Sequence, residues 1–165
     1  MKKYLIDTNI FIESANRHYA IDICPGFWDF LIKISKLDNV KSIIQVYDEF
    51  TPDDERLKNF RQNLKGNHFF LPIENITPES YNEVTKTLID MGYAQQAIAN
   101  FSKHADYFLI ALALQENYII VTQEAKSGNN AKNQIKIPNV CDRLGIECID
   151  VVKFLRDEKA KFVLE

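Results

Sequence analysis

Short apolar runs alternate with amphipathic segments along the chain, and this pattern predicts the order of its strands and helices. The short runs predict buried strands at 4–6, 42–44, 69–73, 118–121 and 146–149. Apolar residues spaced three or four positions apart predict a helix at 27–37, and we also expect short helices at 94–101, 138–144 and 151–156. The segment 106–116 is apolar nearly all round, and its Ala and Leu content favours a central helix over a strand. The stretch between the first strand and residue 27 is rich in turn-forming residues.

Two further helices have clear start signals in the sequence. Thr51 and Thr77 are each followed by a proline and an acidic residue. A threonine cap, a proline at the first helical position and an acid at the positive end of the helix dipole together favour a helix start. We therefore expect helices that begin directly after Thr51 and Thr77 and that end at Gly66 and Gly92.

The alternation of strands and helices indicates the fold class. Strands separated by helices are typical of a parallel sheet that is covered by helices on both faces. We expect a single doubly wound α/β domain over 1–165, with a mostly parallel central sheet. A chain of 165 residues buries roughly two-thirds of its unfolded surface in such a domain.

Composition narrows the classes of function. No apolar run approaches the length of about 20 residues that a membrane-spanning helix needs, and the start of the chain lacks the apolar core of a signal peptide. The three cysteines form no CxxC pair, and the histidines lie at no zinc-ligand spacing. We expect a cytoplasmic protein with free thiols, no membrane contact and no structural zinc.

The net charge of −3 argues against nucleic-acid binding through bulk charge.

Four acidic residues follow or face the carboxyl ends of predicted strands. Asp7 ends the first strand, Glu49 lies just past the second and Glu124 lies just past the strand 118–121. Asp106 opens the helix that leads into that strand. Ligands of an open parallel sheet bind outside the carboxyl ends of its strands, so we expect these carboxylates to gather at one edge.

Such a cluster needs a counter-ion. Two carboxylates ~5 Å apart repel by about 3 kcal/mol at an effective dielectric constant of ~20. Hard oxygen ligands select Mg²⁺ or Mn²⁺, which position a phosphodiester, lower the pKa of a water molecule and stabilise a departing oxyanion. Hydrolysis of a phosphodiester uses all of these effects.

Four motifs in this order resemble the PIN-domain family of nucleases, and most closely its compact prokaryotic branch, which includes VapC-type toxins. The motifs are YLIDTNIFIE at 4–13, VYDEF at 46–50, ADYFLIA at 105–111 and VTQE at 121–124. The resemblance implies a PIN-like fold and an Mg²⁺- or Mn²⁺-dependent endoribonuclease. It also implies that a metal is held by Asp7, Glu49, Asp106 and Glu124.

The resemblance assigns supporting roles as well. Thr8 and Asn9 would orient Asp7, and Thr122 would support the site from the end of its strand. Glu124 stands where an Asp or Asn is commoner, and its longer side chain leaves direct and water-mediated metal contact both open.

Partners follow from the same resemblance and from local charge. Lys126, Lys132 and Lys136 lie in the loop beside the expected metal site, where they would contact RNA phosphates. The resemblance implies an RNA substrate, an antitoxin protein that neutralises a toxin, and a homodimer. Freestanding RNA processing is the second choice.

Three of the acids also have a purely structural interpretation. In it, Asp7 would only cap a turn, Asp106 would only be favoured by the dipole of its helix, and Glu124 would be a solvated loop acid. Asp48 is an alternative to its neighbour Glu49. His104 is expected at an exposed or capping position rather than in general-base catalysis.

Two other functions compete with the nuclease. One is a catalytically silent PIN-like module that binds RNA or protein. The other is a haloacid-dehalogenase-like phosphatase, whose chemistry needs a second Asp where this chain has Asn9.

Overall fold

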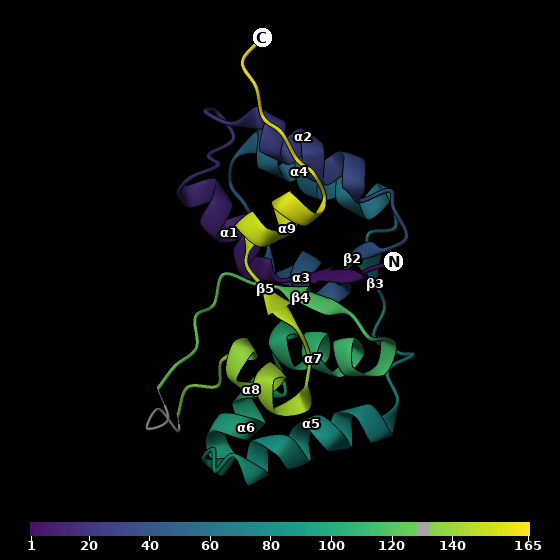
Figure 1. Cartoon of the computed structure of the whole chain (residues 1–165), viewed down its shortest axis with the longest axis vertical. Helices are drawn as coiled ribbons and strands as arrows, with labels where there is room; N and C mark the ends of the chain where they lie inside the picture. Colours follow the sequence, from purple (N-terminus) through teal and green to yellow (C-terminus); the bar gives the residue numbers. More distant parts are fainter. Residues whose placement is uncertain (129–132) are drawn as a thin grey trace.

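The computed structural model describes residues 1–128 and 133–165, which form a five-stranded, all-parallel sheet with helices on both faces (Figure 1). The strands are β1 (Tyr4–Ile6), β2 (Val40–Ile43), β3 (Phe70–Leu71), β4 (Ile119–Val121) and β5 (Cys148–Ile149). They lie in the order β3-β2-β1-β4-β5. All three residues of the central strand β1 are buried. The expected α/β class with a parallel sheet is confirmed.

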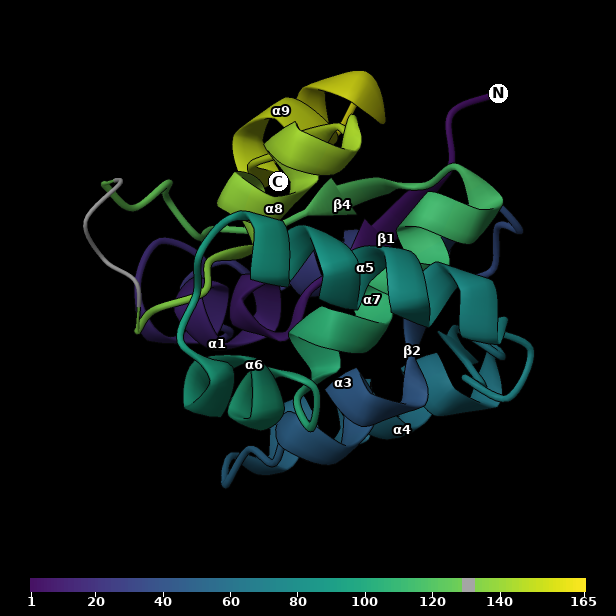
Figure 2. The same ribbon diagram turned by 90° about the horizontal axis from the view of Figure 1, so that it is seen from below.

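Helices form a layer on each side of the sheet (Figures 1 and 2). One layer holds α1 (Thr8–Asn16), α2 (Pro25–Ile34), α4 (Glu55–Gly66) and α9 (Val151–Asp157). The other holds α5 (Pro78–Asp90), α6 (Gln95–Phe101), α7 (Ala105–Glu116) and α8 (Ile137–Leu144). The short helix α3 (Ile44–Glu49) follows β2 without a loop.

Helix α7 is apolar on nearly all sides because it packs against α5, α8 and the sheet. Leu109, Ile110 and Ala111 are fully buried. The helix ends at Asn117, which adopts the left-handed conformation with φ of 60° and ψ of 48°. Asn tolerates this conformation better than most residues, so the predicted end of the helix is confirmed.

The stretch after β1 was predicted as turns, and this prediction was wrong. The carboxylate of Asp7 accepts a hydrogen bond from the backbone N–H of Thr8 and caps α1. Ile10 and Phe11 then enter the core on one side of that helix. Asp-Thr-Asn therefore begins a helix here, because the residues that favour turns also favour helix N-termini.

Two boundaries around Glu49 also differ from the prediction. Ile44 begins α3 rather than ending β2, so Glu49 is the last residue of a helix.

Helix α4 begins at Glu55 and not after Thr51, because the side chain of Asp54 accepts a hydrogen bond from the backbone N–H of Arg56. Gly66 is its last residue, and the positive φ of 56° falls on His68. The start after Thr77 is confirmed, since Thr77 caps α5.

The other expected boundaries shift by a few residues at most. Helix α2 ends at Ile34, and the outer strands β3 and β5 are each two residues long. The cysteines are free thiols, as expected. The longest described helix has 13 residues, and none in the described ranges has the length and apolar character needed to cross a membrane.

Candidate active site

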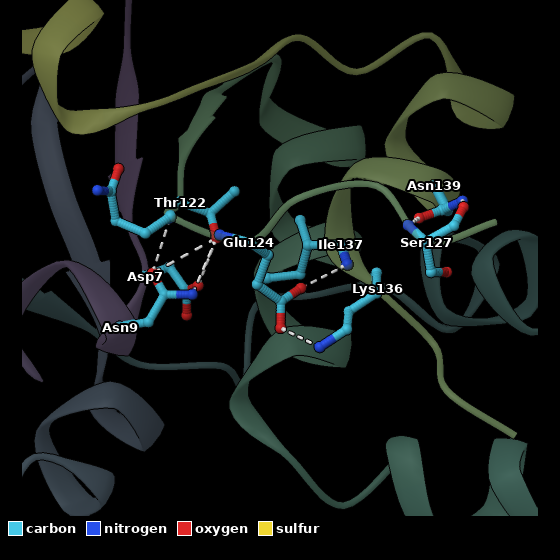
Figure 3. A network of polar contacts seen from close by, with 9 residues as sticks. Asp7, Asn9, Thr122, Glu124, Ser127, Lys136, Ile137 and Asn139 are labelled. Atoms are coloured by element: carbon cyan, nitrogen blue, oxygen red, sulfur yellow. Dashed lines mark hydrogen bonds and ion pairs between the residues drawn. The ribbon is translucent and has the colours of Figure 1, made fainter. Parts of the chain in front are cut away.

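The candidate site lies where the strand order reverses, at the carboxyl ends of β1 and β4. Successive crossovers leave β1 in opposite directions at this point, which is where open parallel sheets bind their ligands. Ile6 pairs with Val121, and the backbone N–H of Asp7 donates to the carbonyl of Val121 at 3.0 Å. Asp7 and Thr122, the residues that follow the two strands, therefore lie side by side (Figure 3).

Asp7 is a buried carboxylate whose two oxygens are each held by a hydrogen bond. Oδ1 accepts from the backbone N–H of Thr8 at 2.7 Å, and Oδ2 accepts from the hydroxyl of Thr122 at 2.8 Å. The residue is only 2% exposed. Burial, followed by the negative charge of Asp106, raises the pKa of Asp7 well above its ordinary value despite these bonds.

Thr122 and Asn9 join the ends of β1 and β4 into one network (Figure 3). The amide nitrogen of Asn9 donates to Thr122 Oγ1 at 3.1 Å, and its Oδ1 accepts from the backbone N–H of Gln123 at 2.9 Å. Thr122 Oγ1 also accepts from the backbone N–H of Glu124 at 3.1 Å. The position of Asp7 is thus fixed through two polar side chains from opposite ends of the sequence.

Glu49 ties three helices together at the rim of the site. Its Oε2 accepts from the hydroxyl of Thr8 at 2.9 Å, and its Oε1 accepts from the backbone N–H of Ala105 at 3.1 Å. The second bond satisfies a free N–H group at the positive end of α7. Asp48, the neighbouring alternative, is exposed to solvent, as Glu49 is, but it makes neither of these bonds.

Asp106 lies in the first turn of α7 and is partly buried. Its pKa is raised from 3.8 to about 7, and burial is the largest cause. The negative charges of Glu124 and Glu49 contribute to this rise, and the positive charge of Lys136 opposes it. Within the described residues, neither Asp106 nor Asp7 is ion-paired with a Lys or Arg.

Glu124 is held by the N-terminus of α8 instead of being a solvated loop acid. Its Oε2 accepts from the backbone N–H of Ile137 at 2.8 Å, and its Oε1 lies 3.9 Å from the ammonium of Lys136 (Figure 3). Its side chain is only 18% exposed. Nearby, Ser127 and Asn139 exchange two hydrogen bonds, which fix the residues after Glu124 to α8.

The structure separates the predicted basic residues. Lys136 lies at the site beside Glu124, whereas Lys126 forms an ion pair with Asp142. Lys132 lies outside the described residues. His104 occupies the N-cap position of α7, is exposed and makes no side-chain capping bond.

The chemistry of these donors fits a hard divalent cation, because the donor atoms are carboxylate oxygens and no described Lys or Arg forms an ion pair with Asp7 or Asp106. Residues 1–128 and 133–165 nevertheless contain no group of three His, Cys, Asp or Glu side chains that is close enough to hold a metal. Glu49 and Glu124 instead bond to backbone N–H groups of neighbouring helices. Burial raises the pKa values of Asp7 and Asp106, so among the described residues these are the two acids of the site whose charges are least compensated.

Sequence reasoning did not anticipate Gln123 or Asn139 as parts of this network. Gln123 Oε1 accepts from the backbone N–H of Val151, and Asn139 bonds to Ser127. No local sequence signal marks these side chains, because their partners come from other elements of the fold.

Comparison with known proteins gives one family assignment. Neither the curated proteins nor the solved structures contain a match to the chain. One family model matches residues 4–162, a span that runs from β1 to beyond α9 and includes all four carboxylates. The chain therefore belongs to the family described as Domain of unknown function (DUF4411).

Proposed function

We propose that this protein is a cytoplasmic, metal-dependent endoribonuclease that hydrolyses phosphodiester bonds of RNA. The supporting observation is the juxtaposition of Asp7 and Asp106, two carboxylates with raised pKa values at the point where the strand order reverses. Carboxylates with perturbed pKa values at this point of the sheet favour a functional site over a purely structural one. The resemblance to PIN domains, which stays a prediction, supplies RNA as the substrate.

Asp7 and Asp106 would hold Mg²⁺ or Mn²⁺, with Glu49 and Glu124 contributing directly or through water. Such a metal supplies charge neutralisation, polarisation of a phosphoryl oxygen and activation of a water molecule. The chain itself provides the rigid frame. Thr8 and Thr122 fix the two oxygens of Asp7, and Glu49 fixes the start of α7, which carries Asp106.

Among the described basic residues, only Lys136 forms an ion pair with one of the four acids, Glu124. Its charge would contact a phosphate of the substrate at the edge of the site, while Glu124 holds it there. This arrangement suits a protein with a net charge of −3, because it attracts RNA locally and not through its whole surface.

The test is cleavage of single-stranded RNA by the purified protein with Mn²⁺, with Mg²⁺ or with EDTA. We expect cleavage only with metal, and loss of cleavage by at least two orders of magnitude in Asp7→Asn and Asp106→Asn. Asp48→Asn is the matched control, since it removes an exposed acid next to Glu49. Wild-type rates in both site variants would rule out the assignment.

A silent binding module is the second candidate, and the engagement of Glu49 and Glu124 by backbone N–H groups favours it. Calorimetric titration with Mn²⁺ separates the two functions. An active site binds Mn²⁺ with an affinity that Asp7→Asn abolishes, whereas a silent module binds RNA without any metal requirement.

The biological setting that the resemblance favours is a toxin with an antitoxin partner, acting as a homodimer. Expression of the active chain in bacteria should then arrest growth, and Asp106→Asn should relieve the arrest. Unimpaired growth with an active nuclease would favour freestanding RNA processing. Sedimentation of the purified chain tests the dimer.

A further inference from the structure

A small pocket lies beside the carboxylates, between α6, the start of α7 and the residues that lead into α8. Its volume is about 250 Å³. Pockets for drug-sized ligands are typically ~300–1,000 Å³, so this one suits a single ring system. The carboxylate site itself does not include it.

Two residues that line the pocket are also neighbours of the carboxylate site. His104 lines the pocket and directly precedes Ala105, whose backbone N–H is bound to Glu49. Lys136 lines the opposite wall and lies 3.9 Å from Glu124. A nucleotide whose phosphate lies at the carboxylates would therefore place its neighbour at this pocket.

The lining combines an apolar part with amide side chains. Phe101 and Ile135 supply apolar surface, and Asn100, Asn133 and Gln134 supply amides. Amides carry a donor and an acceptor side by side, and they read the edges of bases, adenine above all. Apolar and aromatic side chains receive the faces of unpaired bases in RNA recognition.

The charge of the pocket also differs from that of the whole protein. The described residues that line it include Lys136 and His104 but no Asp or Glu. The chain as a whole has a net charge of −3. A hollow lined by amides and a lysine, with no acid among its described lining residues, suits a ligand that carries phosphate next to a base.

We propose that this pocket binds one unpaired nucleobase, with adenine preferred, from the nucleotide next to the phosphate at the carboxylate site. The assignment deepens the proposed ribonuclease function and rests on it for the position of the phosphate. It makes the pocket a determinant of where RNA is cut.

Binding is tested with nucleoside monophosphates and ¹⁵N-labelled protein in EDTA, so that cleavage plays no part. AMP should shift the side-chain resonances of Asn100 and Gln134 and bind more tightly than CMP or UMP. Asn100→Ala and Gln134→Ala should each weaken AMP binding roughly tenfold, because a good base contact contributes between a few-fold and a hundredfold. Asn59→Ala, an exposed amide on α4, is the control.

Cleavage mapping on a random RNA pool with Mn²⁺ gives a second readout. Wild type should prefer adenine at one position beside the cut, and Asn100→Ala with Gln134→Ala should lose this preference while still cutting. Cleavage without any base preference, or AMP shifts outside the pocket, overturns the proposal and leaves the nuclease intact. AMP binding at the pocket in a protein that cuts no RNA supports the base pocket and overturns the proposed nuclease function.

Discussion

Replacement of Asp106 by Asn should make the metal-free protein more stable and less sensitive to pH. Burial and the charges of Glu124 and Glu49 raise the pKa of Asp106 from 3.8 to about 7. The folded state therefore binds this proton more tightly than the unfolded state does. The free energy of unfolding should fall as pH rises from 4 to 7, because the folded protein must ionise a carboxyl group that it holds better when neutral.

The size of the effect follows from the shift in pKa. Each unit of pKa shift corresponds to 1.36 kcal/mol, so the free energy of unfolding should fall by up to about 4 kcal/mol over the whole pH range. About 3 kcal/mol of this falls between pH 5 and pH 8. Partial solvent access to Asp106 and its coupling to Asp7 make these values upper bounds. Total stabilities are ~5–15 kcal/mol, so even half of this effect is measurable.

Urea denaturation in EDTA at pH 5, 6, 7 and 8 measures the effect. Wild type and the control Asp48→Asn should lose stability across this range. Asp106→Asn should lose much less and should exceed wild type at pH 8. Added Mn²⁺ should stabilise wild type at pH 8 more than the variant, since a bound cation neutralises the same charges. Parallel pH curves for wild type and Asp106→Asn would refute the reasoning.

Three further substitutions test other contacts of the structure. Thr122→Val keeps the shape of the side chain but removes the hydroxyl that donates to Asp7. Urea denaturation should show that the free energy of unfolding falls by about 1–3 kcal/mol, and the pKa of Asp7 should rise further. Glu124→Gln removes the negative charge that raises the pKa of Asp106 most, so NMR titration of the Asp106 carboxyl should show a lower pKa. An unchanged pKa would contradict this electrostatic argument. Phe162→Ala removes a ring that contacts Tyr19, Phe27 and Phe30; because Phe162 is 38% exposed, thermal or urea unfolding should show a loss of about 1–2 kcal/mol, less than the ~3–5 kcal/mol of a fully buried Phe.

The sheet could be predicted from the sequence because its strands are short, mostly apolar and separated by helices. The order of the helices followed for the same reason, except at α1 and α3. In α1 the cap Asp7 and the polar Thr8 and Asn9 suit a turn as well as a helix start, and only tertiary packing of Phe11 decides between them. In α3 the apolar residues continue those of β2 without a break, so periodicity gives no boundary.

The four acids could be placed at one edge from topology alone, since each lies near the carboxyl end of a strand or at the start of the helix that feeds one. Their bonding could not be predicted. Asn9 and Gln123 are 114 positions apart, and Glu49 and Ala105 are 56 apart. Pairing over such separations depends on the exact angles of strands and helices, which a hydrophobic pattern does not specify.

The difference between the two pairs of acids explains how an acidic site can exist in a stable fold when no metal is bound. Glu49 and Glu124 each accept a backbone N–H at a helix start, so their charges are offset by the dipoles of α7 and α8. Burial raises the pKa values of Asp7 and Asp106, and the bonds of Asp7 to Thr8 and Thr122 and the positive charge of Lys136 near Asp106 oppose this rise only in part. The electrostatic strain of the site is thus concentrated on these two carboxyl groups, whose protonated forms burial favours when no cation is present. Binding of a divalent cation would release those protons, and the same event would prepare the site for an anionic substrate.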